Sequence, residues 1–82
     1  MNISFKATAR KQLKKLPKIE ARKIFKKIQV LKEFPFAGKS LSGEFEGSRS
    51  VRAWPYRIIY SVKPKIGIII ETIKHRQESY KK

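Results

Sequence analysis

Hydrophobic positions in the first 34 residues change from a spacing of two to a helical spacing. Residues 2–6 alternate between apolar and polar side chains, which is typical of a short, half-buried strand. Residues 7–16 and 18–34 instead repeat apolar side chains every three or four positions, which predicts two amphipathic helices. Thr8 is a candidate N-cap for the first helix, and Pro17 suits the first turn of the second. A strand followed by a helical hairpin is therefore expected.

The second half of the chain alternates loop-forming and strand-forming stretches. Residues 35–48 are rich in Gly, Pro and Ser and predict a loop. Three β-rich stretches follow, and their short connections favour an antiparallel meander: residues 48–52, 56–62 and 66–74. The first connection holds Trp54-Pro55, where a two-residue type I′ turn is excluded because proline cannot adopt a positive φ. A slightly longer or bulged turn is expected there.

The predicted order of elements, β-α-α-β-β-β, defines an α+β fold. The N-terminal helical hairpin should pack on one face of a small, mainly antiparallel curved sheet. A length of 82 residues leaves too little core for two domains, so residues 1–82 form a single predicted domain. The chain shows neither an apolar run that could cross a bilayer nor the apolar core of a signal peptide, and a cytoplasmic protein without membrane partners is expected.

Composition narrows the chemistry that this domain can carry. Cysteine and aspartate are absent and there is one histidine, so disulfides, thiolate zinc sites and thiol catalysis are excluded, and neither a metal nor another cofactor is expected. Lys and Arg number 21 against six Glu, which gives a net charge of +15 and indicates a polyanion or an acidic protein as partner. Residues 1–32 hold eleven of these cations and one Glu, although part of this excess could simply solvate the helices.

Arginines in the second half of the chain are the first candidates for a binding site. Four of the six lie on or just after the predicted strands: Arg49, Arg52, Arg57 and Arg76. A guanidinium group stays charged and grips phosphate oxygens at two points, although arginines on a solvated sheet face need no ligand. His75 could act as a general acid or base, or be structural, and Tyr80, in the polar tail, could stack on an unpaired base.

Cleavage of RNA is a reaction that such residues could catalyse. The 2′-hydroxyl of RNA supplies the nucleophile, so the protein must orient it, stabilise the extra negative charge of the phosphorane and manage two protons. Arginines supply the electrostatic stabilisation. A tyrosine, whose pKa is ordinarily about 10, could serve as base if neighbouring arginines favour its phenolate. Cleavage is expected to be slow unless another molecule positions the RNA.

Several segments, in this order, resemble the RelE/ParE superfamily of bacterial toxins. They are Lys14-Lys15-Leu16-Pro17, Leu41-Ser42-Gly43 ahead of Arg49-Ser50-Val51-Arg52, Tyr56-Arg57-Ile58-Ile59-Tyr60, and His75-Arg76-Gln77-Glu78-Ser79-Tyr80. The resemblance covers essentially the whole chain and implies a toxin of a type II toxin–antitoxin pair. In the RelE branch the toxin enters the ribosomal A site and cuts mRNA without a metal, whereas in the ParE branch it poisons DNA gyrase.

The C-terminal pattern of a basic residue, an arginine and a tyrosine favours the RelE branch. The resemblance then implies that Arg57 stabilises the transition state, that Arg76 acts on the phosphate or the leaving group, and that Tyr80 orients or deprotonates the 2′-hydroxyl. His75 precedes the arginine where many relatives also carry histidine, and is included as a catalytic candidate. Positions implied to bind the RNA backbone are Arg49, Arg52 and Lys74.

Partners follow from the same resemblance. They are the ribosome, mRNA and a cognate antitoxin that is acidic in its toxin-binding segment and joins the toxin in a hetero-oligomer. A non-enzymatic basic module that binds RNA or the ribosome without cutting remains an alternative, because the charge would be the same. The identity of the general base stays open, since residues 35–41 lack the glutamate that serves as base in one subgroup.

Overall fold

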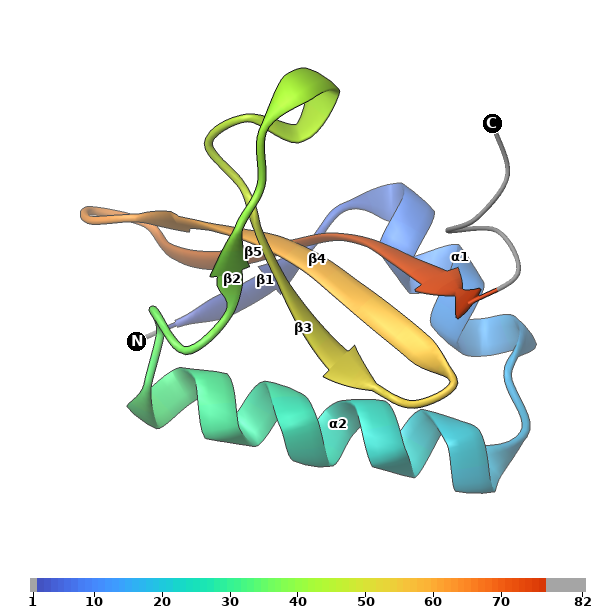
Figure 1. Ribbon diagram of the computed structural model, residues 1–82. Helices are drawn as coiled ribbons and strands as arrows, with labels where there is room; N and C mark the ends of the chain where they lie inside the picture. Colours follow the sequence, from blue (N-terminus) through green and yellow to red (C-terminus); the bar gives the residue numbers. More distant parts are fainter. Residues whose placement is uncertain (1, 77–82) are drawn as a thin grey trace.

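The computed structural model describes residues 2–76 and confirms the α+β fold (Figure 1). A short strand β1 (Ile3–Phe5) leads into the helical hairpin, and a long loop leads from the hairpin to the meander. The remaining elements are α1 (Ala7–Lys15), α2 (Lys18–Glu33), β2 (Lys39–Ser40), the 3-10 turn η1 (Gly43–Phe45), β3 (Arg49–Ala53), β4 (Tyr56–Lys63) and β5 (Gly67–His75). Strand β2 and η1 lie inside the stretch that the sequence predicts as a loop.

The five strands form one mixed sheet in the order β1-β5-β4-β3-β2. Strands β2 to β5 pair in antiparallel fashion, which includes the predicted meander, while β1 pairs with β5 in parallel. The two residues of β2 were missed because a stretch this short shows no alternation to read. Strand β1, at the start of the described chain, forms one edge of the sheet (Figure 1). Strand β5, near the end of the described chain, lies next to it.

Helix α1 begins at Ala7, where the predicted helical stretch begins, but Thr8 is not its N-cap. Lys6 occupies that position, without a side-chain cap. Its backbone N–H still donates to Ile70 O of β5, while its carbonyl already accepts from the Arg10 N–H. The last sheet bond and the first helical bond therefore fall on one residue, so the helix must start at Ala7. Pro17 likewise stands at the N-cap of α2 and not inside its first turn.

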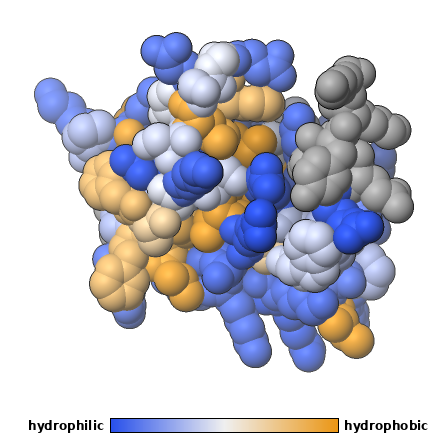
Figure 2. Space-filling model, in the orientation of Figure 1, coloured by the Kyte–Doolittle hydropathy of each residue, from blue (hydrophilic) through white to orange (hydrophobic). Residues whose placement is uncertain are grey.

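The hydrophobic core lies between the helices and one face of the sheet. Ile24, Ile28 and Leu31 of α2 are buried at the predicted helical spacing, whereas Phe25 stays half exposed. They meet side chains from the centre of the sheet: Ile58, Tyr60, Ile68, Ile70 and Ile73. Figure 1 shows α2 running along this face, and Figure 2 shows hydrophobic side chains on the surface of the same side of the molecule. Val30 near the end of α2, and Phe34 and Phe36 just after it, are exposed.

A bulge in β5 determines which of its residues face the core. Ile59 pairs with Thr72 but the next residue, Tyr60, pairs with Ile70, so Glu71 has no direct partner on β4. An inserted residue shifts the alternation of side chains by one. Ile70 and Ile73 can therefore both face the core although three positions separate them.

Helix α1 covers the part of β5 that β1 leaves unpaired. Strand β1 pairs only with residues 68–70, which exposes the edge of β5 from the bulge onwards. There Gln12 Oε1 accepts a hydrogen bond from the Ile73 backbone N–H at 2.7 Å, and Gln12 Nε2 donates to Thr72 Oγ1 at 3.1 Å. A glutamine side chain thus takes the place of a neighbouring strand at an otherwise open edge.

The turn between β3 and β4 is shorter than the sequence predicted. Ala53 pairs with Tyr56, so the connection consists of Trp54 and Pro55 alone, and the peptide bond between them is cis. A cis proline reverses the chain in two residues without a positive φ, which is the type VI turn. The exclusion of a type I′ turn therefore stands, but the expectation of a longer or bulged connection was wrong.

Candidate functional site

Three cations form a row across the face of the sheet that points away from the core. Arg52 of β3 pairs directly with Arg57 of β4, which pairs directly with Lys74 of β5. Their chain neighbours Val51, Ile58 and Ile73 pair with one another and pack in or against the core, so the row must point the other way. We call Arg52, Arg57 and Lys74 the cationic row.

Among residues 2–76, no carboxylate forms an ion pair with a member of the cationic row. Like charges directly opposite each other in a sheet repel. Within residues 2–76 the ion pairs are Lys6–Glu71 and Lys23–Glu20, and neither includes a member of the row. The three cations therefore repel one another across the sheet, and an anionic ligand would reduce this repulsion.

One end of the row opens into a small pocket that suits a phosphate. Arg52 and Arg57 line it together with Lys39 of β2, which reaches this place because it pairs with Ser50 of β3. The pocket has a volume of about 250 Å³, and Ser50 and Leu41 complete its walls. Two guanidinium groups and one ammonium group converge here, which is the donor set that binds phosphate oxygens. We call it the cationic pocket.

Sequence reasoning missed Lys39, and no pattern in the chain could have revealed it. The residue stands in a stretch of Gly, Ser and Pro without periodicity, and only its pairing with β3 brings it to the arginines. Arg52, Arg57 and Lys74, by contrast, were all predicted, and the structure brings these three together.

Arg76 lies just beyond the row, beside the turn between β3 and β4. Its backbone N–H donates to Pro55 O at 2.8 Å, which ties the end of β5 to the turn. Its guanidinium carbon stands 5.2 Å from the centroid of the Trp54 ring, a cation–π contact on an exposed surface. Arg76 follows the last residue of β5, and these contacts place it at the turn, beside the row and not in it.

Arg49 lies on the opposite side of the sheet from Arg52. It pairs with the buried Tyr60, and its Nη1 donates to Gly38 O at 2.8 Å and more weakly to Phe36 O at 3.4 Å. The guanidinium carbon also stands 5.0 Å from the centroid of the Phe36 ring. The structure therefore separates Arg49 from the cationic row and uses it to hold the loop that follows α2.

His75 is next to Lys74 in the chain but points to the other side of β5. It pairs with Tyr56, and the two rings meet edge to face, with centroids 5.3 Å apart and planes at 84°. Tyr56 itself packs against the core. The structure thus does not bring His75 into the cationic pocket. Tyr80, the remaining predicted residue, lies outside the residues that the structure describes.

Tyr60 is excluded as a base by its surroundings. Burial raises the pKa of Tyr60 above its ordinary value, while the hydrogen bond from the Gly38 N–H and the charge of Arg49 act in the opposite direction. The hydroxyl also donates to Pro35 O at 2.9 Å. A phenol in this position stays protonated near neutral pH, and its hydroxyl holds the loop that follows α2.

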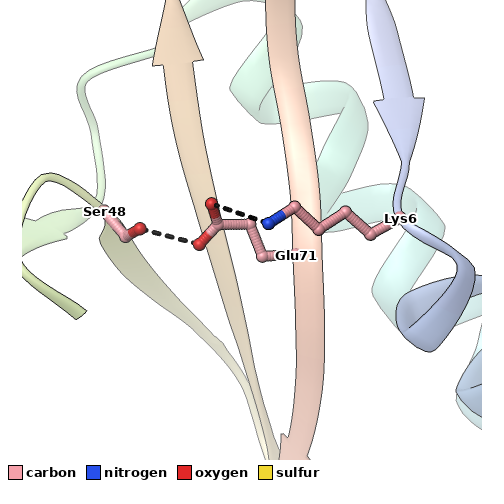
Figure 3. A network of polar contacts seen from close by, with 3 residues as sticks. All are labelled: Lys6, Ser48 and Glu71. Carbon is pink, nitrogen blue, oxygen red and sulfur yellow. Dashed lines mark hydrogen bonds and ion pairs between the residues drawn. The ribbon is translucent and has the colours of Figure 1, made fainter. Parts of the chain in front are cut away.

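A polar network lies beside the row, on the bulged residue of β5. Ser48 Oγ donates to Glu71 Oε1 at 2.7 Å, and Lys6 Nζ stands 3.8 Å from Glu71 Oε2 (Figure 3). Figure 3 shows the two partners approaching the carboxylate from opposite sides, one from the loop before β3 and one from the segment after β1. Next to it, Lys74 Nζ lies 4.9 Å from the centroid of the Phe45 ring of η1.

Residues 2–76 contain no group of three or more His, Cys, Asp or Glu side chains placed to hold a metal ion. None of their helices is long and apolar enough to cross a membrane.

Residues 3–80 match the family model of the ParE toxin of type II toxin–antitoxin systems, parDE. Among solved structures, the chain is similar to the toxin–antitoxin complex RelBE2 of Mycobacterium tuberculosis, with 29% identity, a TM-score of 0.81, and coverage of 92% of this chain and 96% of that chain. For the archaeal RelE–RelB complex of Pyrococcus horikoshii the identity is 27%, the TM-score 0.76 and the coverages 92% and 93%. For the YoeB–YefM complex of Staphylococcus aureus the identity is 21% and the TM-score is 0.76, with coverage of 92% of this chain and 95% of that chain. A search of curated proteins finds no match.

A family model that spans nearly the whole chain and a shared fold lead to one conclusion. The protein belongs to the RelE/ParE superfamily of toxins from type II toxin–antitoxin systems.

Proposed function

We propose that the protein is a ribosome-dependent mRNA endonuclease, the toxin of its toxin–antitoxin pair, and that it acts in the cytoplasm. The observation that carries this proposal is the cationic row with its pocket. Arg52, Arg57 and Lys39 line a pocket of about 250 Å³, and within residues 2–76 no ion pair neutralises them. A scissile phosphate bound there would be surrounded by fixed positive charge on the open face of a rigid sheet.

The proposed reaction uses the RNA as its own nucleophile. The 2′-hydroxyl attacks the adjacent phosphorus and loses its proton, the bond to the 5′-oxygen breaks, and that oxygen takes up a proton. The products are a 2′,3′-cyclic phosphate and a 5′-hydroxyl. The phosphorane between them carries an extra negative charge, which Arg57 and Arg52 stabilise. Removing one such donor typically costs about 10²–10³ in rate.

The remaining roles fall to residues at and after the end of β5. Arg76 follows the strand directly, beside the turn, and we assign it to the phosphate or the leaving oxygen. Lys74 binds the RNA backbone. We propose that Tyr80 orients or deprotonates the 2′-hydroxyl, as the resemblance implies. His75 remains a catalytic candidate from sequence, but its contact with Tyr56 suits a supporting role for the end of β5 better than direct proton transfer.

The ribosome supplies what the isolated domain lacks. A shallow site on a sheet cannot by itself orient a single strand for in-line attack, so a second surface that holds the codon would supply much of the rate. The net charge of +15 would also steer the domain to ribosomal RNA.

An acidic antitoxin is the proposed protein partner. The similar solved structures RelBE2, RelE–RelB and YoeB–YefM are toxin–antitoxin complexes. An antitoxin with acidic segments would neutralise the basic surface of this chain, and a segment that is disordered when free could fold on it. The complex would then be a hetero-oligomer.

Inhibition of DNA gyrase is the second candidate, because the matching family model is named for ParE. Primer extension on translated mRNA from cells that express the chain separates the two functions. We expect cleavage within translated frames, lost in Arg57→Ala and kept in Arg22→Ala, which removes the same charge from the surface of α2. An absence of cuts together with blocked supercoiling would identify a gyrase poison. Binding of RNA without cuts would identify a passive binder.

A further inference from the structure

A second hollow adjoins the cationic row on the side away from the cationic pocket. It has a volume of about 540 Å³ and lies between η1 with the loop after it and the bulged part of β5. Phe45 and Ser48 line it from the loop, Glu71 and Lys74 from β5, and Lys6 from the end of β1. We call this space the loop hollow. Lys74 belongs both to it and to the cationic row, so the loop hollow adjoins the row at the end opposite the cationic pocket.

Phe45 gives the loop hollow an aromatic surface. Its side chain is half-buried, and the Lys74 ammonium group lies over its ring. Every nucleobase can stack on such a ring, and one base stacked on an aromatic side chain is worth about 1–3 kcal/mol. A base that takes the place of the ammonium group on Phe45 would leave Lys74 free to contact the neighbouring phosphate.

Glu71 gives the loop hollow a fixed hydrogen-bond acceptor. Its side chain is 21% exposed and is held by Ser48 on one oxygen and by Lys6 near the other. An ionised carboxylate has about four lone-pair sites, so it can accept further hydrogen bonds, but it cannot donate. It therefore favours a ligand that presents N–H groups over one that presents carbonyl oxygens.

The other charges of the loop hollow argue against a second phosphate. Glu44 and Glu46 also line it, so carboxylates outnumber the two lysines. Phosphates would be repelled here and attracted to the row, whereas an uncharged aromatic group with amino hydrogens meets no such repulsion. The cationic row thus suits the phosphate of a nucleotide, and the loop hollow suits its base.

We propose that the loop hollow binds one of the two bases that flank the scissile phosphate, with Phe45 stacking on the base and Glu71 selecting bases with an exocyclic amino group. This rests on the proposed nuclease function. Cytosine and uracil test the idea best, because they have the same size and differ in presenting an amino group or a carbonyl at one edge. The loop hollow should prefer cytosine.

Cleavage of short mRNAs on purified ribosomes gives the first test, with cytidine or uridine on either side of the cut. We expect the wild type to favour cytidine at one of these positions about tenfold, as a good base contact allows. Glu71→Gln should bring that ratio to about one, while Glu33→Gln on α2 should keep it. Phe45→Leu should slow the cutting of both RNAs about tenfold, Phe45→Tyr should restore it, and Phe34→Leu should have no effect. Unchanged ratios and rates in the Glu71 and Phe45 variants would overturn the proposal.

A titration without ribosomes separates this inference from the proposed function. Cytidine 5′-monophosphate and uridine 5′-monophosphate are added to the ¹⁵N-labelled wild-type protein, and the amide signals of residues 44–48 and 71–74 are followed. We expect these signals to shift at about tenfold lower concentrations of the cytidine nucleotide. If the wild type cuts no RNA, the nuclease proposal fails and this titration alone decides on the loop hollow. Equal responses to both nucleotides, or none at residues 44–48, would reject it.

Discussion

Arg49 and Tyr60 are direct partners across β3 and β4, and both side chains hold the same loop. Arg49 Nη1 donates to Gly38 O, while the Tyr60 hydroxyl accepts from the Gly38 N–H at 2.8 Å and donates to Pro35 O. A Cβ on Gly38 would come 2.5 Å from that hydroxyl, so the contact requires glycine. The next residue is Lys39 of the cationic pocket. The hydrogen bonds of Arg49 and Tyr60 to this loop, which we call the latch, lie on the core side of the sheet. They therefore help to position Lys39 of the cationic pocket on the other side.

Arg49→Lys tests the latch without changing the net charge. Lysine cannot keep both the hydrogen bond to Gly38 O and the planar contact with Phe36. We expect the free energy of unfolding to fall by about 1 kcal/mol, measured by urea denaturation. Arg52→Lys is the matched control on the other face, where no bond to the loop is lost, and should stay within about 0.5 kcal/mol of the wild type. Equal losses in both variants would contradict the role of Arg49.

The raised pKa of Tyr60 predicts a loss of stability in alkali. The folded protein holds the phenol proton more tightly than the unfolded chain, whose tyrosine has the ordinary pKa of 10.0. The contribution is fully present below pH 10.0 and is lost as the pH rises through the folded pKa. Tyr60→Phe should therefore show a shallower decline of unfolding free energy above that pH than the wild type. The same slope in Tyr60→Phe and in the wild type would refute the prediction.

The repulsion within the cationic row predicts that removing one of its charges makes the folded protein more stable. Arg57→Gln removes the central charge, which should raise the free energy of unfolding at low salt by about 0.2–1 kcal/mol, the usual size of a cross-strand charge effect. The gain should shrink at high salt because screening already weakens the repulsion. Arg22→Gln lowers the net charge equally but lies on α2 and should gain less. Denaturation of both variants at two salt concentrations checks this, and equal gains would count against the row.

Gln12 should protect the edge of β5. Gln12→Met keeps the length of the side chain but leaves the Ile73 N–H without its acceptor, which should cost about 1–3 kcal/mol. Hydrogen exchange of the Ile73 amide should become faster, while Lys11→Met, one residue earlier and exposed, should change neither quantity. If the Ile73 amide exchanges at the wild-type rate in Gln12→Met, another group protects that edge.

The spacing of residues along a strand already shows which of the predicted site residues lie on the same face of the sheet. Arg49 and Arg52 are three residues apart, an odd spacing that places them on opposite faces of a strand, and His75 follows Lys74 directly. The expectation that Arg49 and Arg52 bind RNA together did not use this spacing, and the structure places the two on opposite faces of the sheet. The opposing positions of Arg52, Arg57 and Lys74 required the register of three strands, which depends on a two-residue turn that the sequence suggested would be longer.

The sequence alone determined the elements that depend on local periodicity: two amphipathic helices, four of the five strands, and the concentration of arginines on or just after the last three of these strands. Tertiary structure decided the rest. It placed Lys39 beside the arginines through a strand of two residues, inserted Glu71 as a bulge and folded Phe45 over Lys74. Periodicity reports only which side of an element is apolar. Which charges then meet is set by pairing between residues far apart in the chain, and no local pattern records that pairing.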